Sequence, residues 1–395
     1  MKAVYLNDYG VVCSLGRDVQ TVRRALMDPV DPVGLTSTDR FTPGRSFHLG
    51  LVVGDMPDVG HMKQHFQSKN NQLGLLALRQ IEPAVRQAID RYGRNRVAIV
   101  VGTSTSGQLE AEAARSQFER EGKWPDGFDY KVQELGNLAV FLSFYLGTTG
   151  VAHVISTACS SSAKALASAA RLLDSGMVDA VVAGGVDALN SLTITGFSAL
   201  ESVSPGRTNP LSVNRSGISL GEGAALFLMT REGGPVRLAG WGETSDAHHM
   251  SAPDPTGRGA RLAMELALKR AGVHPEQVDY INLHGTGTHH NDVMEALAVS
   301  DLCGPSVPVS STKPLTGHTL GAAGAIEAAF ACMTLTDNPS WTLPPNWWDG
   351  QTDPGLSKLE IVAPTYSLGR APGYVLSNSF AFGGSNASLL FGVGA

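Results

Sequence analysis

The sequence predicts an α/β fold made of two similar halves, and three observations lead to this prediction. Short apolar runs alternate with helical stretches along the whole chain of 395 residues. A loop rich in glycine and threonine follows one such run at residues 102–105 and another at residues 285–288. A Ser-Thr pair precedes a chemically reactive residue in each half, at residues 156–157 and at residues 311–312. The alternation predicts mixed, largely parallel sheets covered on both faces, and the repeated loops indicate a duplication.

The first half is predicted from apolar runs and from helices rich in small residues. Continuous apolar runs bounded by glycine indicate buried strands. Pro83 should kink or restart the first long helix, because proline removes a backbone donor. In chain order we expect a helix at Leu73–Tyr92, a strand at Val97–Val101, an apolar run at Val154–Ala158, a helix at Ser160–Leu173, and strands at Ala180–Gly185 and Ala224–Met229.

The second half repeats this plan after a Gly-Gly-Pro turn at residues 233–235. The expected halves are therefore residues 1–234, which carry the candidate nucleophile, and residues 235–395, which carry the candidate histidines and lysine. The predicted elements are strands at Val236–Trp241 and Tyr280–Leu283, helices at Arg258–Ala271 and Ala322–Leu335, and closing strands at Leu359–Ala363 and Tyr374–Ser379.

Composition narrows the classes of function. A net charge of −6 excludes nucleic acid as a general partner, because phosphate binding needs a basic surface. The four cysteines are widely spaced, and the first eight residues lack the apolar core of a secretion signal. We therefore expect reduced thiols and a cytoplasmic protein. No apolar stretch approaches the ~18 residues of a membrane span, so none is predicted.

Cys159 is the strongest candidate nucleophile. It stands where an apolar run gives way to a helix of small residues. Backbone N–H groups and the helix dipole at such a junction lower the pKa of a thiol and favour the thiolate. The alternative is a buried structural cysteine, which behaves as a small hydrophobe. A catalytic role therefore needs a histidine or lysine partner that the fold supplies.

The expected sheets give such partners a meeting point. Ligands of open α/β sheets gather at the carboxyl ends of strands, and Cys159, His284 and Lys313 each follow such an end. We therefore expect these three residues in one site. The histidine pairs at 248–249 and 289–290 lack the spacing of a zinc site, so no metal is predicted.

Five short segments resemble the β-ketoacyl-acyl-carrier-protein synthases, condensing enzymes of the thiolase-like superfamily. They read Thr-Ala-Cys-Ser-Ser at 157–161, His-Gly-Thr-Gly-Thr at 284–288, Ser-Thr-Lys-Pro-Leu-Thr-Gly-His at 311–318, Gly-Ala-Ala-Gly at 321–324 and Asn-Ser-Phe-Ala-Phe-Gly-Gly-Ser-Asn at 378–386. Each segment alone is weak, but the five occur in the family's order over nearly the whole chain. The resemblance implies a thiolase-like fold, a duplicated five-layer α-β-α-β-α arrangement, and no metal or organic cofactor.

The same resemblance implies a decarboxylative Claisen condensation. Cys159 would accept an acyl group from the phosphopantetheine thioester of an acyl carrier protein, and the N–H groups of Cys159 and Phe382 would bind the oxyanion. His284 and His318 would hydrogen-bond the malonyl thioester oxygen where enolate charge develops, and Lys313 would tune these histidines. Structural histidines and a surface lysine are the alternatives, but turns after strands favour the catalytic roles.

Further residues would support the chemistry. Thr286 and Thr288 resemble residues that bind the pantetheine arm, although such threonines often make only turn bonds. Phe380 and Phe382 resemble acyl-pocket and gating aromatics, with ordinary core packing as the alternative, more so for Phe380. The matching acids are Asp292, Glu295 and Glu327. Glu327 would share a polar network with Lys313, whereas the other two acids could also stabilise the first turn of a helix.

Departures from the family pattern indicate a specialised synthase. Ala381 stands where glycine is usual, residues 210–217 lack the usual acids, and His-His-Asn at 289–291 replaces a turn that contains proline. An aryl-polyene or similar type II polyketide pathway is the preferred interpretation, with fatty-acid synthesis as the alternative.

Three other classes of protein compete with this interpretation. A thiolase needs a second catalytic cysteine in a C-terminal turn, but Phe382 occupies that turn and Cys332 lies in an apolar helical pattern. Initiating synthases use Cys, His and Asn, whereas His318 follows Lys313 here. A chain-length-factor-like partner subunit typically lacks the nucleophile that this chain keeps.

The expected partners are an acidic acyl carrier protein and a second subunit. A homodimer is the family expectation, and a heterodimer with a chain-length-factor-like subunit is the alternative. Lys63, Lys69 and Arg207 are candidate docking residues for the carrier, although each could be an ordinary surface charge.

Overall fold

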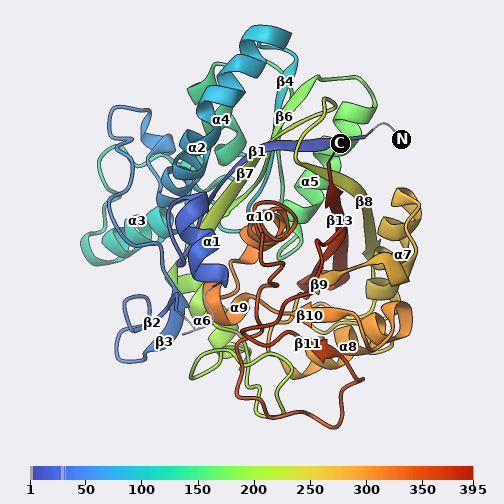
Figure 1. Cartoon of the computed structure of the whole chain (residues 1–395). Helices are drawn as coiled ribbons and strands as arrows, with labels where there is room; N and C mark the ends of the chain where they lie inside the picture. The colour runs from blue at the N-terminus through green and yellow to red at the C-terminus, as the bar shows by residue number, and fades with distance from the viewer. Residues whose placement is uncertain (1–2, 28–30, 32, 395) are drawn as a thin grey trace.

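A mixed sheet of 11 strands runs through the described part of the molecule (Figure 1). The computed structural model describes residues 3–27, 31 and 33–394, so the ends of the two predicted halves, residues 1, 2 and 395, lie outside it. The strands of the first half are β1 (Tyr5–Val12), β4 (Val97–Gly102), β5 (Ala152–Ile155), β6 (Ala180–Asp187) and β7 (Gly223–Thr230). Those of the second half are β8 (Val236–Ser245), β9 (Tyr280–Asn282), β10 (Pro308–Ser310), β11 (Glu360–Ile361), β12 (Tyr374–Ala381) and β13 (Ser385–Val393), and a separate hairpin holds β2 (Leu35–Thr38) and β3 (Phe47–Gly50).

The strand order repeats in the two halves. From the middle of the sheet outwards it is β1-β7-β6-β4-β5 in one direction and β8-β13-β12-β9-β10 in the other, with β11 added at the end. In both halves the inner pairs are antiparallel and the outer pairs are parallel. The sheet is therefore mixed, as predicted, but parallel only in its outer parts. This repetition supports a boundary near residue 234, which we propose as the border between the halves.

Helices form three layers around the two halves of the sheet (Figure 1). The central layer contains α5 (Ser161–Asp174) and α10 (Ala323–Leu335), which pack against each other. One outer layer contains α2 (Lys69–Tyr92) and α4 (Asn137–Leu146), and the other contains α7 (Arg258–Ala271) and α8 (His289–Cys303). The remaining helices are α1 (Val19–Met27), α3 (Gln108–Glu121), α6 (Ser191–Ala199) and α9 (Lys313–Thr316), and short 3-10 turns include Leu320–Ala322 and Phe382–Gly384. This is the predicted five-layer arrangement.

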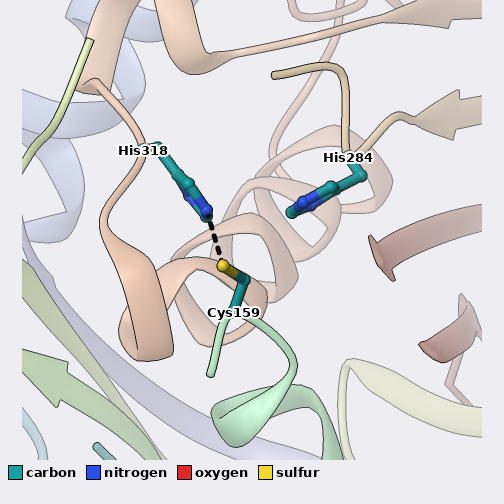
Figure 2. Close-up of side chains that lie close together, drawn as sticks. All are labelled: Cys159, His284 and His318. Carbon is teal, nitrogen blue, oxygen red and sulfur yellow. Dashed lines mark hydrogen bonds between the residues drawn. The ribbon is translucent and has the colours of Figure 1, made fainter. Parts of the chain in front are cut away.

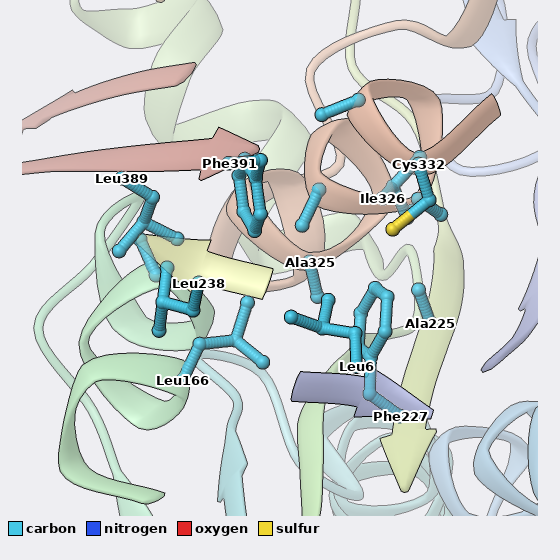
Figure 3. Close-up of a cluster of buried hydrophobic side chains, with 14 of the residues drawn as sticks. Leu6, Leu166, Ala225, Phe227, Leu238, Ala325, Ile326, Cys332, Leu389 and Phe391 are labelled. Atoms are coloured by element: carbon cyan, nitrogen blue, oxygen red, sulfur yellow. The ribbon is translucent and has the colours of Figure 1, made fainter. Parts of the chain in front are cut away.

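The largest apolar core lies between the halves. It joins Leu166 of α5 and Ile326 of α10 to side chains of both half-sheets, such as Phe227 and Phe391 (Figure 3). Every residue of α10 is buried, as expected for a helix that is apolar on all sides. A single shared core therefore holds the two halves, and with them the residues of the site, in fixed positions.

Two local predictions need correction. Helix α2 runs without interruption from Lys69 to Tyr92 and contains Pro83, so the predicted kink or restart does not divide it. The first closing strand is only Glu360–Ile361, shorter than the predicted Leu359–Ala363. The second predicted closing strand, β12, pairs along its whole length with a further strand, β13, which the sequence did not reveal.

Candidate active site

A cavity of about 110 Å³ opens beside Cys159 and draws residues from both halves of the chain. It lies past the carboxyl ends of β5, β9 and β12, where a ligand site was expected. Its lining contains both candidate histidines, His284 and His318, and the predicted Thr286, Thr288, Phe380 and Phe382. The fold therefore brings these predicted residues together around the thiol.

Cys159 lies between β5 and α5 at a tightly constrained turn. Ala158 before it has a φ of +52°, an uncommon conformation for a residue other than glycine. The Cys159 thiol lies 2.9 Å from Nε2 of His318 (Figure 2). The backbone N–H groups of Phe382 and of Cys159 itself also hydrogen-bond the sulfur. The thiol is thus surrounded by a proton acceptor and two backbone donors.

The predicted lowering of the thiol pKa is wrong. Burial raises the pKa of Cys159 to about 12, and this outweighs the opposite effects of Lys313 and of the backbone donors. The position at a helix start was correctly predicted, but the sequence does not reveal that Cys159 is buried, with 6% of its surface exposed. Removal of the thiol proton therefore requires a base, and His318 is within hydrogen-bond distance.

The two histidines stand on either side of the cavity as neutral imidazoles. His284 follows β9, His318 follows α9, and their ring centroids are 5.2 Å apart at an interplanar angle of 84° (Figure 2). Burial, and next the positive charge of Lys313, lower the pKa of both histidines well below 6.5. At neutral pH each ring therefore has one N–H donor and one acceptor nitrogen.

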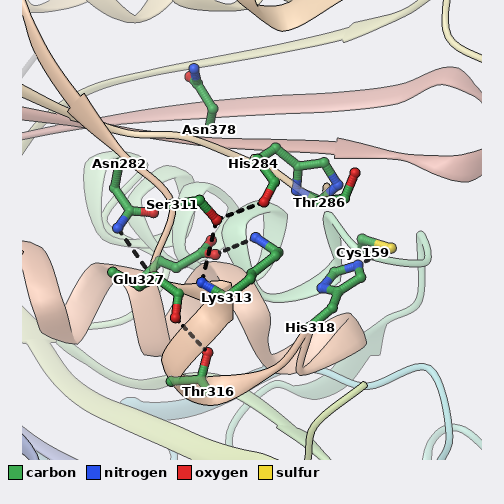
Figure 4. A network of polar contacts seen from close by, with 12 residues as sticks. Cys159, Asn282, His284, Thr286, Ser311, Lys313, Thr316, His318, Glu327 and Asn378 are labelled. Atoms are coloured by element: carbon green, nitrogen blue, oxygen red, sulfur yellow. Dashed lines mark hydrogen bonds and ion pairs between the residues drawn. The ribbon is translucent and has the colours of Figure 1, made fainter. Parts of the chain in front are cut away.

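Lys313 is a buried member of an ion pair, not a surface lysine. Its Nζ lies 2.6 Å from Oε1 of Glu327, and their side chains are 1% and 4% exposed (Figure 4). Within the described residues, Oε2 of Glu327 has no hydrogen-bond partner. Burial raises the pKa of Glu327, and Lys313 opposes this effect. The predicted polar network is therefore present behind the histidines.

The other two predicted acids hold backbone groups of the His284 loop. Glu295 accepts hydrogen bonds from the N–H groups of His284 and Gly285, both at 2.8 Å. Asp292 lies in the first turn of α8 and accepts from Leu211 at 2.8 Å and, at 3.2 Å, from the N–H of Gly287. Burial raises the pKa of Glu295 to about 7. These carboxyl groups fix the loop that carries His284.

The wall of the cavity combines hydroxyl and aromatic groups. The hydroxyl groups of Thr286 and Thr288 are 2.8 Å apart. Phe380 is buried, with its ring centroid 6.2 Å from that of His284. Phe382 is 37% exposed and lies 5.5 Å from the ring of Phe197. An apolar wall with a few polar groups suits an acyl chain on a polar arm.

Comparison with known proteins assigns the chain to a family. Residues 9–233 match the N-terminal domain of β-ketoacyl synthases, and residues 236–346 match their C-terminal domain. The chain belongs to the β-ketoacyl synthase family. A 3-oxoacyl-[acyl-carrier-protein] synthase 2 of Vibrio cholerae is 33% identical over 99% of both chains. The predicted activity class, that of a 3-oxoacyl-acyl-carrier-protein synthase, is confirmed.

Solved structures confirm the thiolase-like ketosynthase fold. One matching structure is the ketosynthase ApeO in complex with its chain length factor ApeC, from Xenorhabdus doucetiae. The matching chain is 42% identical to this one with a TM-score of 0.89, and the match covers 99% of this chain and 98% of that chain. A type II polyketide synthase complex, AntDE:AntF, in which an acyl-carrier protein is bound to its ketosynthase, is 22% identical over 99% of both chains with a TM-score of 0.87. The second match concerns the fold alone.

Several residues of this β-ketoacyl synthase site were not found from the sequence. Phe197 of α6 faces Phe382 across the cavity. Asp246 and Asn386 line the same cavity and hydrogen-bond each other at 2.7 Å. Asp187 is a fully buried carboxylate at the end of β6. The family segments quoted from the sequence include only Asn386 among these four, and nothing in the periodicity marks the others.

A metal ion fits the synthase site poorly. Ligand atoms of Cys159, His284 and His318 lie within 4.8 Å of one another, the one such group within the described residues. Histidines that bind metals usually donate their second ring N–H to a carboxylate or carbonyl. Nδ1 of both His284 and His318 lacks a hydrogen-bond partner in the part of the chain that the structure describes. The cluster is better suited to thiol chemistry than to holding a metal.

Two of the predicted docking residues of the synthase are not free on its surface. Lys69 pairs at 2.6 Å with Glu222, which is buried. Arg207 is partly buried and donates to the carbonyl of Pro314. Lys63 alone of the three is exposed. None of the described helices is long and apolar enough to cross a membrane.

Proposed function

We propose that this β-ketoacyl synthase carries the growing acyl chain on Cys159 and extends it with malonyl units from an acyl carrier protein. The observation that carries the proposal is the thiol, 2.9 Å from the neutral His318, in a cavity that His284 also lines. The residues take part in two successive steps, transfer and condensation.

In the transfer step, the sulfur of Cys159 attacks the carbonyl carbon of the acyl thioester. His318 removes the thiol proton through Nε2, and the new C–S bond forms as the pantetheine C–S bond breaks. The leaving pantetheine sulfur takes up the proton from His318. The N–H groups of Phe382 and Cys159, which already point at the sulfur, stabilise the intermediate oxyanion.

In the condensation step, malonyl thioester loses carbon dioxide and its bonding pair forms an enolate. Neutral histidines can donate a hydrogen bond to the thioester oxygen where this charge develops. Lys313 contributes by lowering the pKa of both imidazoles. The enolate carbon then attacks the acyl carbonyl, and the bond between that carbon and the Cys159 sulfur breaks. The departing thiolate takes up a proton from solvent, because the neutral His318 has already passed its proton to the pantetheine sulfur.

We propose that the enzyme acts in a type II polyketide pathway, aryl-polyene or similar. Fatty-acid synthesis is the alternative. The 42% match to a ketosynthase that acts with a chain length factor exceeds the 33% match to a 3-oxoacyl-acyl-carrier-protein synthase 2. Ala381, the last residue of β12 before the turn at Phe382–Gly384, stands where the family usually has glycine and agrees with a specialised enzyme.

A panel of acyl-carrier-protein thioesters tests the pathway. Saturated, polyunsaturated and aromatic acyl groups are offered with malonyl carrier protein, and the condensed products are identified by mass spectrometry. We expect faster condensation with the polyunsaturated or aromatic chains. Exclusive use of saturated chains would assign the enzyme to fatty-acid synthesis.

The histidine roles have a separate test. His284→Ala and His318→Ala should lose release of carbon dioxide from malonyl carrier protein while Cys159 still reacts with iodoacetamide. Lys269→Gln is the control, because this exposed residue of α7 does not line the cavity. Normal carbon dioxide release by both histidine variants would refute the enolate role.

We also propose that a second subunit covers the outer edge of the first half. Strand β5 is the last strand of the sheet, and its first residue, Ala152, is exposed. Val140 and Phe144 on the adjacent α4, together with Val151, are exposed apolar residues beside it. An edge strand has unpaired backbone N–H and C=O groups that can pair with a strand of another chain. A chain-length-factor-like subunit is the proposed occupant, and a second copy of this chain is the alternative.

Light scattering of the chain alone and with its chain-length-factor-like partner separates these two assemblies. Phe144→Lys should weaken either assembly, whereas Leu262→Lys, an exposed apolar site on α7, should not. A monomer in both conditions would contradict the proposed interface.

For the carrier protein we propose docking near Lys63, at the border of the proposed subunit interface, because its Nζ lies 5.3 Å from the ring of Phe144. Charge reversal by Lys63→Glu should slow acyl transfer at low salt, and Lys269→Glu on α7 serves as the control. Equal rates and salt dependence for Lys63→Glu and the wild type would place docking elsewhere.

A further inference from the structure

Asp187 at the end of β6 is a fully buried carboxylate with an unusual set of partners. It accepts six hydrogen bonds, and none comes from a lysine, arginine or histidine. The donors are Oγ1 of Thr103 at 2.6 Å, the N–H and Oγ of Ser104 at 2.8 and 2.5 Å, the N–H and Oγ1 of Thr105 both at 2.9 Å, and the N–H of Gly321 at 2.6 Å. Burying a charged carboxylate is energetically costly, and the cost is offset only when its oxygens accept hydrogen bonds.

The donors belong to two segments that lead to the two reacting groups. The loop at 103–105 follows β4, and its Thr103 N–H donates to the carbonyl of Ile155 at 3.3 Å, at the end of the strand before Cys159. Gly321 follows His318 by three residues. Leu320 between them has a φ of +52°, which non-glycine residues rarely adopt. The Asp187–Gly321 bond therefore restrains a strained turn next to the proposed base.

We propose that Asp187 is a positioning residue that ties the turn after His318 to the loop beneath Cys159, so that the imidazole and the thiol keep their 2.9 Å contact. This rests on the proposed role of His318 as the base. The packing around Gly321 agrees with it, because a Cβ there would lie 2.7 Å from Oδ2 of Asp187 and 2.9 Å from the backbone N of Ser104. Gly321 therefore packs too closely against Asp187 and the loop at 103–105 to carry a side chain without displacing them.

The charge of Asp187 has a second effect on the thiol. Burial is the main reason that the pKa of Cys159 is raised, and the negative charge of Asp187 adds to it. A residue that acted only through packing would not move the titration of this thiol. The pH dependence of thiol reactivity therefore separates Asp187 from an ordinary buried side chain.

The isosteric change Asp187→Asn is the informative variant. An amide has one acceptor oxygen, and its NH₂ group can only donate. If the amide oxygen keeps the hydrogen bonds from the loop at 103–105, the NH₂ group faces the N–H of Gly321. Two donors then face each other, and the hydrogen bond from Gly321 is lost. The variant thus loosens the His318 turn and also removes the charge.

The experiment uses the full-length enzyme in two assays, acyl transfer from an acyl carrier protein and alkylation of Cys159 by iodoacetamide between pH 6 and 10. For Asp187→Asn we expect acyl transfer to fall at least about tenfold, as misplacement of a catalytic group does, and the alkylation profile to move to lower pH. Asp279→Asn changes another buried carboxylate, which pairs with Arg370 at the end of β9 opposite His284, and should leave the alkylation profile unchanged. Acyl transfer at the wild-type rate, or an unmoved profile, in folded Asp187→Asn would overturn the proposal.

A second variant covers the case in which Asp187→Asn does not fold. Gly321→Ala keeps the carboxylate but forces the turn away from it, so acyl transfer should fall while the alkylation profile stays at the wild-type pH. Normal transfer by this variant would refute the positioning role. Because iodoacetamide needs no carrier protein, the alkylation results remain decisive even if the proposed acyl transfer to Cys159 fails in the wild type.

Discussion

Replacing Lys313 with methionine should destabilise the protein strongly, because it leaves Glu327 buried without its counter-charge. The two side chains are 1% and 4% exposed, and Oε2 of Glu327 has no hydrogen-bond partner among the residues that the structure describes. Removing one partner of a buried ion pair costs about 3–5 kcal/mol, whereas replacing both by apolar groups is often nearly neutral. We expect Lys313→Met to lose free energy of unfolding in this range, and Lys313→Met with Glu327→Leu to recover most of it.

The loss should depend on pH in a defined direction. Burial already raises the pKa of Glu327, and removing Lys313 removes the group that opposes this. The folded variant then binds a proton that the unfolded chain releases near pH 4.5, so its stability falls by up to about 1.4 kcal/mol per unit as pH rises above that value. Urea unfolding at pH 5 and at pH 8 measures this. A cost of about 1 kcal/mol or less for the single variant, as for a solvated pair, would refute the reasoning.

Two further predictions concern the thiol and the loop beside it. With a pKa of about 12, roughly one in 100,000 Cys159 side chains is a thiolate at pH 7. The rate of alkylation of the wild type should therefore keep rising through pH 9. A plateau near pH 7 would instead support the pKa lowering that was predicted from the helix dipole. Gly384→Ala should destabilise the fold more than Gly383→Ala, because only at Gly384 would a Cβ meet Asp246, at 2.9 Å. Gly383→Ala should cost about 1–2 kcal/mol, which is the cost of its φ of +81° alone. Equal unfolding free energies for the two variants would contradict this.

The elements that could be predicted from the sequence have a strong local signal. The helix at Arg258–Ala271 has the predicted bounds, and β6 and β7 lie on the predicted apolar runs. The family segments also brought the thiol, the histidines and Lys313 into one expected site, and the structure places them together. Each of these features is encoded within a short segment, so residues far away in the sequence contribute little to it.

The remaining features depend on tertiary contacts. Strand β1 contains Asn7 and Asp8 yet lies in the middle of the sheet, where the pairing shifts register between Leu6 and Asp8. The pKa of Cys159 follows from burial, and the ion pair of Lys69 follows from Glu222, which lies 153 residues away. Asp187 collects donors from segments more than 80 residues distant. No local pattern in the sequence indicates such partners.

Acylation of Cys159 is the most direct test of the proposed chemistry. The enzyme is incubated with an acyl carrier protein that carries a short acyl thioester, and its intact mass is measured. The wild type should gain the mass of one acyl group, localised by peptide mapping to Cys159, and Cys159→Ala should gain none. An adduct of equal yield on Cys159→Ala, or an acyl group mapped to another residue, would contradict the account.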